Sequence, residues 1–317
     1  MKRIALLLGA TLGLTALLGA AAQAWEPKKP IKIIVGFSPG GGTDIVARTI
    51  VASAQEFFPV PLVVVNKPGA GGTLAAEFVS KSKPDGYTLL VAGGSESTSV
   101  PNHRKVNYDI GEFVGIIRLI RSRIFFGVQS SSNIKSIEDL AKEAKANPGK
   151  LSYSSSGQGS ILHSSMLLLA NDLKADLRHV PYKGGAPAMA AMLGGHVDIA
   201  MIGGPEEAQA HLAAGKIRLL ATPSDTRFPG LPDVPTLKEL GHDVYVDNMK
   251  GLVAPKGTPD EVAKYLHDTF KKGLDSTVWA KMAGKLKLET GYLSGDDFIG
   301  AMKKMSANIG DAVKNLK

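Results

Sequence analysis

The sequence contains no cysteine, few aromatic residues and only one long apolar run. Without cysteine the chain can form neither disulfides nor an N-terminal lipid-modified cysteine, so the fold must be held by its core. Its 317 residues, 44% of them hydrophobic, suffice for such a core and suggest about two domains. The seven histidines show no metal-binding spacing, and phosphate-loop and dinucleotide-binding motifs are absent. We therefore expect no metal and no cofactor.

Positive charge is in excess but is not clustered. The 37 lysines and arginines outnumber the 29 acidic residues, which gives a formal net charge of +8. The basic residues form no long run and do not alternate with aromatic residues, so no nucleic-acid partner is predicted. A small anionic ligand or an anionic envelope surface fits this charge better. We also expect the protein to be a monomer.

Residues 1–24 have the pattern of a secretory signal peptide. Lys2 and Arg3 precede an apolar stretch over 4–22, and Ala22-Gln23-Ala24 fits the cleavage site. The alternative is a membrane anchor that is retained. Cleavage would place the protein in the bacterial periplasm and, by removing two positive charges, lower the net charge from +8 to +6. No later run is long and apolar enough to span a bilayer.

Strands that end in glycine-rich loops and continue as helices recur along the chain. The stretch Ile31–Asp44 reads IKIIVGFSPGGGTD, an apolar strand followed by glycines and a helix start. Bare N–H groups at a helix start suit a carboxylate or a phosphate. Strands are predicted at 31–37, 61–66, 87–92, 151–155, 177–182, 197–202 and 216–222. Helices are predicted at 43–58, 74–81 (capped by Thr73), 134–146, 161–173, 236–240, 259–274, 278–286 and 294–316. Two further helices follow the loops 183–187 and 203–205 and end at Leu193 and before Gly215.

Two extended segments, 113–129 and 244–255, are predicted to cross between two α/β halves. The sequence therefore predicts two lobes around a cleft, with lobe 1 formed by 25–125 plus 251–317 and lobe 2 by 126–250. The glycine loops lie at the carboxyl ends of the strands, where open α/β sheets bind ligands. Closure of the two lobes over a ligand is the hinge motion expected of such an arrangement.

The ordered set of motifs resembles the Bug receptors, the periplasmic substrate-binding proteins of tripartite tricarboxylate transporters. The resemblance covers nearly the whole chain after residue 24 and is carried by VGFSPGGGTDIVAR (35–48), VVNKPGAGGTLAAEFVSKSKPDGYTLL (64–90), SYSSSGQGSILHSS (152–165), VPYKGGAPAMAAMLGGHVDIAMIG (180–203), GKIRLLAT (215–222), DVPTLKELG (233–241) and GLVAPKGTP (251–259). It implies a type II periplasmic-binding fold and a small organic carboxylate ligand, handed to integral-membrane transporter subunits.

The same resemblance implies a set of binding residues. They are Phe37, Ser38, Pro39, Gly40, Asp44, Ser95, Ser155, Gly157, Ser160, His163, Lys183 and Gly184. Several of these residues also have a purely structural explanation: Asp44 as a helix first-turn acid, Ser160 as an N-cap, and His163 as a buried structural histidine. Lys183 could be a solvated lysine and Phe37 a core aromatic.

Two positions depart from the family pattern. Gly203, also a predicted binding residue, stands where the family often has an aspartate, and Met249-Lys250 replaces a common aromatic position. The missing acid disfavours aspartate and glutamate as ligands, and the two departures together suggest a ligand that is larger or more anionic than a simple amino acid. Two other functions remain open: a receptor that feeds a sensor kinase, and a hydrolase using Ser160 and His163, which lie at i and i+3.

Overall fold

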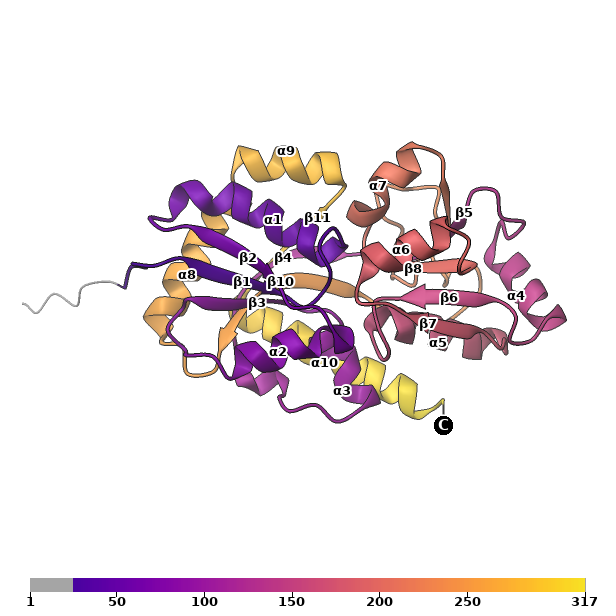
Figure 1. The fold of residues 1–317 in the computed structure, drawn as a ribbon, viewed down its shortest axis with the longest axis horizontal. Coiled ribbons are helices and arrows are strands. Elements are labelled where there is room, and N and C mark those ends of the chain that lie inside the picture. The colour runs from indigo at the N-terminus through magenta and orange to yellow at the C-terminus, as the bar shows by residue number, and fades with distance from the viewer. Residues whose placement is uncertain (1–24, 317) are drawn as a thin grey trace, which may run out of the picture.

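The computed structural model describes residues 25–316 and contains two sheets, each covered by helices (Figure 1). The predicted signal peptide lies outside the described residues. The six-stranded sheet and its helices are called lobe 1, and the five-stranded sheet and its helices lobe 2. This two-lobe α/β fold confirms the predicted class. Within residues 25–316, no helix combines the length and the apolar character needed to cross a membrane.

Lobe 1 has the strand order β11-β4-β10-β3-β1-β2. β1 pairs in parallel with β2 and β3, whereas β10 runs antiparallel to both β3 and β4. The strands are β1 (Ile31–Val35), β2 (Leu62–Asn66), β3 (Thr88–Ala92), β4 (Phe113–Ser122), β10 (Asn248–Pro255) and β11 (Glu289–Ser294). The helices are α1 (Gly42–Ala54), α2 (Thr73–Ser80), α3 (Val100–His103), α8 (Asp260–Leu274), α9 (Thr277–Leu286) and α10 (Gly295–Lys314).

Lobe 2 has the strand order β7-β6-β8-β5-β9. β6 pairs in parallel with β7 and β8, and β5 runs antiparallel to β8 and β9. The strands are β5 (Phe125–Gln129), β6 (Ser152–Ser155), β7 (Arg178–Pro181), β8 (Ile199–Ile202) and β9 (Ile217–Ala221). The helices are α4 (Ile137–Ala146), α5 (Ile161–Leu173), α6 (Gly185–Leu193) and α7 (Pro205–Ala213).

The lobe 1 sheet is buried on both faces, which explains its nearly continuous apolar strands. Successive residues point to opposite sides, so Ile33 packs with α1, α8 and α9 while Ile34 packs with α2 and α10. In Figure 1, α1 and α9 lie on one side of the sheet and α2 and α10 on the other. One apolar face of α10 packs on this sheet, and its residues Phe298, Met302 and Met305 are all buried.

The chain crosses between the lobes twice, as predicted, but the first crossing is not one strand. The extended run 113–129 divides into β4 and β5, which belong to different sheets and are separated by Arg123 and Ile124. The buried Arg123 donates to the Glu289 carboxylate at 2.7 Å and to the Thr226 carbonyl at 2.7 Å. These bonds hold the short connection between the two sheets in place.

The structure differs from the sequence-based expectations at one strand, one short segment and one helix cap. The edge strand β11 was not predicted, because only one of its six residues is aliphatic and its register comes from distant partners in β4. The segment 236–240 is a turn rather than a helix, although Thr236 and Glu239 exchange capping hydrogen bonds. Thr73 is the first residue of α2, and its hydroxyl donates to the Ala70 carbonyl instead of capping the helix.

β4 and the start of α10 approach each other so closely that both contact positions are glycine. A Cβ at Gly115 would collide with the carbonyl oxygen of Gly295, which belongs to the main chain and cannot rotate away. We expect Gly115→Ala to lower the free energy of unfolding by about 2–3 kcal/mol, measured by urea denaturation. The control Gly284→Ala, where a Cβ meets nothing within 4 Å, should be neutral or slightly stabilising. Equal stabilities of the two variants would contradict this close approach.

Candidate functional site

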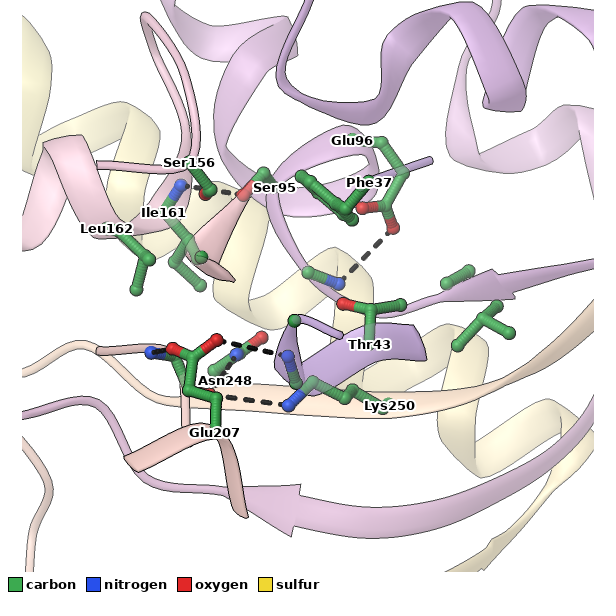
Figure 2. A pocket seen from close by; sticks show the side chains of 17 residues that line it. Phe37, Thr43, Ser95, Glu96, Ser156, Ile161, Leu162, Glu207, Asn248 and Lys250 are labelled. Carbon is green, nitrogen blue, oxygen red and sulfur yellow. Dashed lines mark hydrogen bonds between the residues drawn. The ribbon is translucent and has the colours of Figure 1, made fainter. Parts of the chain in front are cut away.

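A cavity lies between the lobes, at the carboxyl ends of β1, β3, β6 and β8. In Figure 2, Glu207, Asn248 and Lys250 lie on one side of it, opposite Phe37, Ser95 and Glu96. Its lining residues come from both lobes: Phe37, Gly41, Gly42, Thr43, Val91, Ala92, Gly94, Ser95, Glu96, Ser156, Ile161, Leu162, Gly185, Gly203, Glu207, Asn248 and Lys250.

The lobes touch each other directly around this cavity. The Ser38 N–H and hydroxyl both donate to the carbonyl of Lys183, at 3.1 and 3.0 Å. The Ser95 hydroxyl accepts the N–H of Ile161, the first residue of α5, at 3.1 Å. The structure is therefore closed, with main-chain groups of one lobe bonded to the loops of the other.

A carboxylate of the protein itself bridges the two lobes inside the cavity. Glu207, in the first turn of α7, accepts the N–H of Gly42 at the start of α1 at 3.0 Å and also the N–H of Gly203. Burial, followed by the neighbouring charge of Glu206, raises the pKa of Glu207. The site therefore holds a carboxyl group with main-chain N–H donors from both lobes.

Beside Glu207 lies a buried ion pair. The Lys250 ammonium contacts the Glu206 carboxylate at 2.5 Å and donates to the Ser122 hydroxyl at 2.8 Å. Both charged side chains are almost fully buried, so each depends on the other for neutralisation. The second carboxylate oxygen of Glu206 has no hydrogen-bond partner among the described residues.

A third glutamate, Glu96, lies in the turn after β3. Its carboxylate accepts the N–H of Gly93 at 3.1 Å and the hydroxyl of Ser97 at 2.6 Å. Burial raises the pKa of Glu96, because only partial compensation comes from these donors. The cavity is thus lined by one ammonium and two carboxyl groups, and its surplus of acid groups is reduced by the raised pKa values of Glu96 and Glu207.

The residues predicted for the first loop divide between cavity and surface. Phe37 lines the cavity, whereas Pro39 and Gly40 are exposed. Asp44 points into lobe 1 and accepts from Arg48, the Gly40 N–H and Asn66. Burial alone would raise the pKa of Asp44, but these three hydrogen bonds hold it below its ordinary value. Asp44 therefore braces the loop, and its neighbours Gly41, Gly42 and Thr43 face the cavity.

The predicted residues of the β6–α5 loop form a buried network next to the cavity. Ser155 bonds to His179 at 2.7 Å, and Ser160 accepts the N–H of His163, which confirms its role as N-cap of α5. Gly157 packs against Gly71 of lobe 1. Within the described chain the cavity is lined here by Ser156 rather than by Ser155, Gly157, Ser160 or His163.

His163 is part of a stack of imidazole rings. Its ring centroid lies 4.0 Å from that of His179, and its Nδ1 accepts the N–H of Gly159. Burial, followed by His179 and His103, lowers the pKa of His163 to about 3. The Ser160 hydroxyl is bonded to main chain and to Ser155, so the geometry gives no support to a Ser160–His163 hydrolase.

Of the remaining predicted residues, some line the cavity and others lie outside it. Ser95 and Gly203 line the cavity, and the Gly203 carbonyl accepts from Ser122 and Asn248. Lys183 is exposed and contributes its carbonyl to the contact with Ser38. Gly184, the N-cap of α6, packs against Ser38, while its neighbour Gly185 lines the cavity.

The acids of α7 were missed, and one inference from the sequence is wrong. The glycine at position 203 predicts a cleft without an acidic side chain at this place. The structure instead has two, Glu206 and Glu207, three and four residues further along the chain. The signal was present: both glutamates follow Gly203-Gly204-Pro205 in the first turn of a helix, next to a predicted glycine loop. The argument against aspartate and glutamate as ligands therefore loses its basis.

Two closed α/β lobes with a polar cavity at their glycine loops define a two-lobe solute-binding protein. The family model described as "Tripartite tricarboxylate transporter family receptor" matches residues 46–317. The chain belongs to this family of receptors, as the motifs predicted, and its structural neighbours include the periplasmic binding protein BugD.

Relatives over nearly the full length support this assignment. A protein of Cupriavidus necator described as "UPF0065 protein in gbd 5'region" is 38% identical over 290 residues, 91% of this chain and 88% of the relative. BugD has 29% identity and a TM-score of 0.84 over 92% of this chain and 98% of its own. MatC from Rhodopseudomonas palustris with bound malate has 29% identity and a TM-score of 0.83, covering 90% and 99%. A second R. palustris protein, with adipate, also has 29% identity and a TM-score of 0.83, covering 92% and 98%.

Proposed function

We propose that this protein captures a small organic carboxylate in the periplasm and delivers it to the membrane subunits of a tripartite tricarboxylate-type transporter. The observation that supports this most is the position of Glu207, whose carboxyl group accepts one N–H from each lobe. A cavity that holds a carboxyl group in this way has the donors that a ligand carboxylate needs.

Capture requires the two lobes to open and close as units. The proposed moving units are residues 25–125 plus 251–317 and residues 126–250, with the hinge at the two crossings. They differ from the lobes defined by the sheets only within the crossings, at 123–125 and at 248–250. Residues 1–24 act in this proposal as a signal peptide that is removed on export. Lobe closure then replaces the water around the carboxylate by main-chain N–H groups and hydroxyls, among them that of Ser95.

The malate and adipate of the R. palustris relatives define the first ligands to test. Isothermal titration of residues 25–317, freed of copurified ligand by unfolding and refolding, is expected to give saturable binding with at least one di- or tricarboxylate. The panel contains malate, adipate and citrate, with a neutral sugar and a diamine as controls. Tight binding of the sugar or the diamine without binding of any carboxylate would contradict the proposal.

A further inference from the structure

The two oxygens of the Glu207 carboxylate have different partners. One accepts the N–H of Gly203, which lies in the same lobe, two residues before the first residue of α7. The other accepts the N–H of Gly42 in lobe 1, 165 residues away in the sequence. The first bond lies within lobe 2, and the second bond joins the lobes.

The oxygen that reaches lobe 1 sits where two helices begin. Gly42 is the first residue of α1, and Gly185 is the first residue of α6. A Cβ at Gly185 would collide with this same oxygen of Glu207. The main chain thus surrounds one carboxylate oxygen closely, at a place where the N-terminus of α1 also favours negative charge.

We propose that Glu207 is an internal competitor of the ligand: it occupies the carboxylate position at the start of α1 and holds the lobes closed until a ligand carboxylate displaces it. This inference rests on the proposed function and adds to it a residue that sets affinity. A ligand carboxylate has to break the bond between Glu207 and the Gly42 N–H before it can accept that N–H itself. The affinity that is measured is therefore lower than the intrinsic affinity of the open site.

The charged side chains around Glu207 offer an incoming anion no free cation. Glu206 lies next to Glu207, and the ammonium of Lys250 is already paired with Glu206 at 2.5 Å. An incoming anion therefore finds no unpaired ammonium among the charged side chains that line the described cavity. Displacement of Glu207 makes main-chain N–H groups, rather than a free cation, available to the ligand.

Three variants distinguish the occupation of the site by the Glu207 side chain from the effect of its negative charge. Glu207→Ala removes the competing group, Glu207→Gln keeps a neutral acceptor of the same shape, and Glu138→Ala removes an exposed glutamate from the first turn of α4 as a matched control. Binding of malate and adipate is measured by isothermal titration. We expect Glu207→Ala to bind about tenfold tighter than wild type, Glu207→Gln to lie between them, and Glu138→Ala to match wild type.

Weaker or unchanged binding by Glu207→Ala would overturn the inference, and weaker binding would mean that Glu207 contacts the ligand directly. Equal affinities of the Ala and Gln variants would also overturn it, because charge repulsion alone would then explain the gain. Small-angle scattering of the ligand-free proteins provides a test that needs no ligand. Glu207→Ala is expected to have a larger radius of gyration than wild type and Glu138→Ala; an unchanged radius overturns the closing role of Glu207. Failure of wild type and Glu138→Ala to bind any carboxylate would instead count against the proposed function.

Discussion

Acidification from pH 6.5 to 4.5 is expected to destabilise the fold through His163 and His179. Burial lowers the pKa of His179 to about 4, and burial together with its two neighbouring histidines lowers the pKa of His163 to about 3. Both rings are neutral in the folded protein, whereas in the unfolded chain they titrate near pH 6.5. Their contribution is complete above pH 6.5 and decreases below it by about 1.4 kcal/mol per pH unit for each histidine, until the folded rings themselves take up protons.

Two buried glutamates act in the opposite direction. The raised pKa values of Glu96 and Glu207 mean that the folded carboxyl groups bind protons at higher pH than the unfolded ones. Their effect stabilises the folded state as the pH falls, so the wild-type curve contains both contributions. The histidine contribution has to be isolated by comparing variants rather than from one curve.

The variant His163→Asn isolates the contribution of this histidine to the pH dependence of stability. Its unfolding by urea is measured at pH values from 7.5 to 4.5. The slope of unfolding free energy against pH below 6.5 is expected to fall by about 1.4 kcal/mol per unit relative to wild type, because one proton fewer is taken up on unfolding. The exposed His196 provides the control, and His196→Asn should keep the wild-type slope. An unchanged slope in His163→Asn would show that this ring is protonated in the folded state.

Removal of the Lys250 ammonium is expected to cost about 3–5 kcal/mol of unfolding free energy. Lys250→Met leaves the Glu206 carboxylate buried with no counter-charge, and the oxygen of Glu206 that already lacks a partner cannot compensate. The double variant Lys250→Met/Glu206→Gln should recover most of the loss, because it buries no unpaired charge. Chemical denaturation at neutral pH measures all three proteins.

An exposed ion pair of the same length serves as the comparison. Lys264 contacts Asp268 at 2.5 Å on α8, but its side chain is 75% exposed. Lys264→Met is therefore expected to change the stability by no more than about 0.5 kcal/mol. Similar losses for Lys250→Met and Lys264→Met would mean that water reaches the Lys250–Glu206 pair and screens it.

The sequence predicted what depends on local pattern. Strands such as β1 and β3 are short apolar runs that end at glycines, so their positions, and the cleft at their carboxyl ends, follow from residues close together in the chain. Ser160 was recognisable as an N-cap because it stands between a glycine loop and a helical pattern, and in the structure it accepts the N–H of His163. The receptor family followed from the order of these loops.

The details of the cavity depend on contacts that local pattern does not contain. Asp44 and Ser155 look like ligand contacts, yet their side chains are engaged by Arg48 and His179, which come from a neighbouring helix turn and a neighbouring strand. Glu207 reaches lobe 1 only because the two lobes meet at Gly42. Whether the predicted residues that line the cavity, Phe37, Ser95 and Gly203, bind ligand stays a prediction.

The positions of the two tryptophans determine what intrinsic fluorescence can report. Trp279 is buried in lobe 1 and donates its indole N–H to Thr290 of β11 at 2.9 Å, and Trp25 packs against Tyr87 and Tyr265 of the same lobe. Neither indole lines the cavity, and lobe 2 contains no tryptophan. Emission spectra therefore follow the docking of β11 and the integrity of one lobe only, while circular dichroism follows both. A melting curve in which the two signals separate would reveal lobes that unfold one after the other.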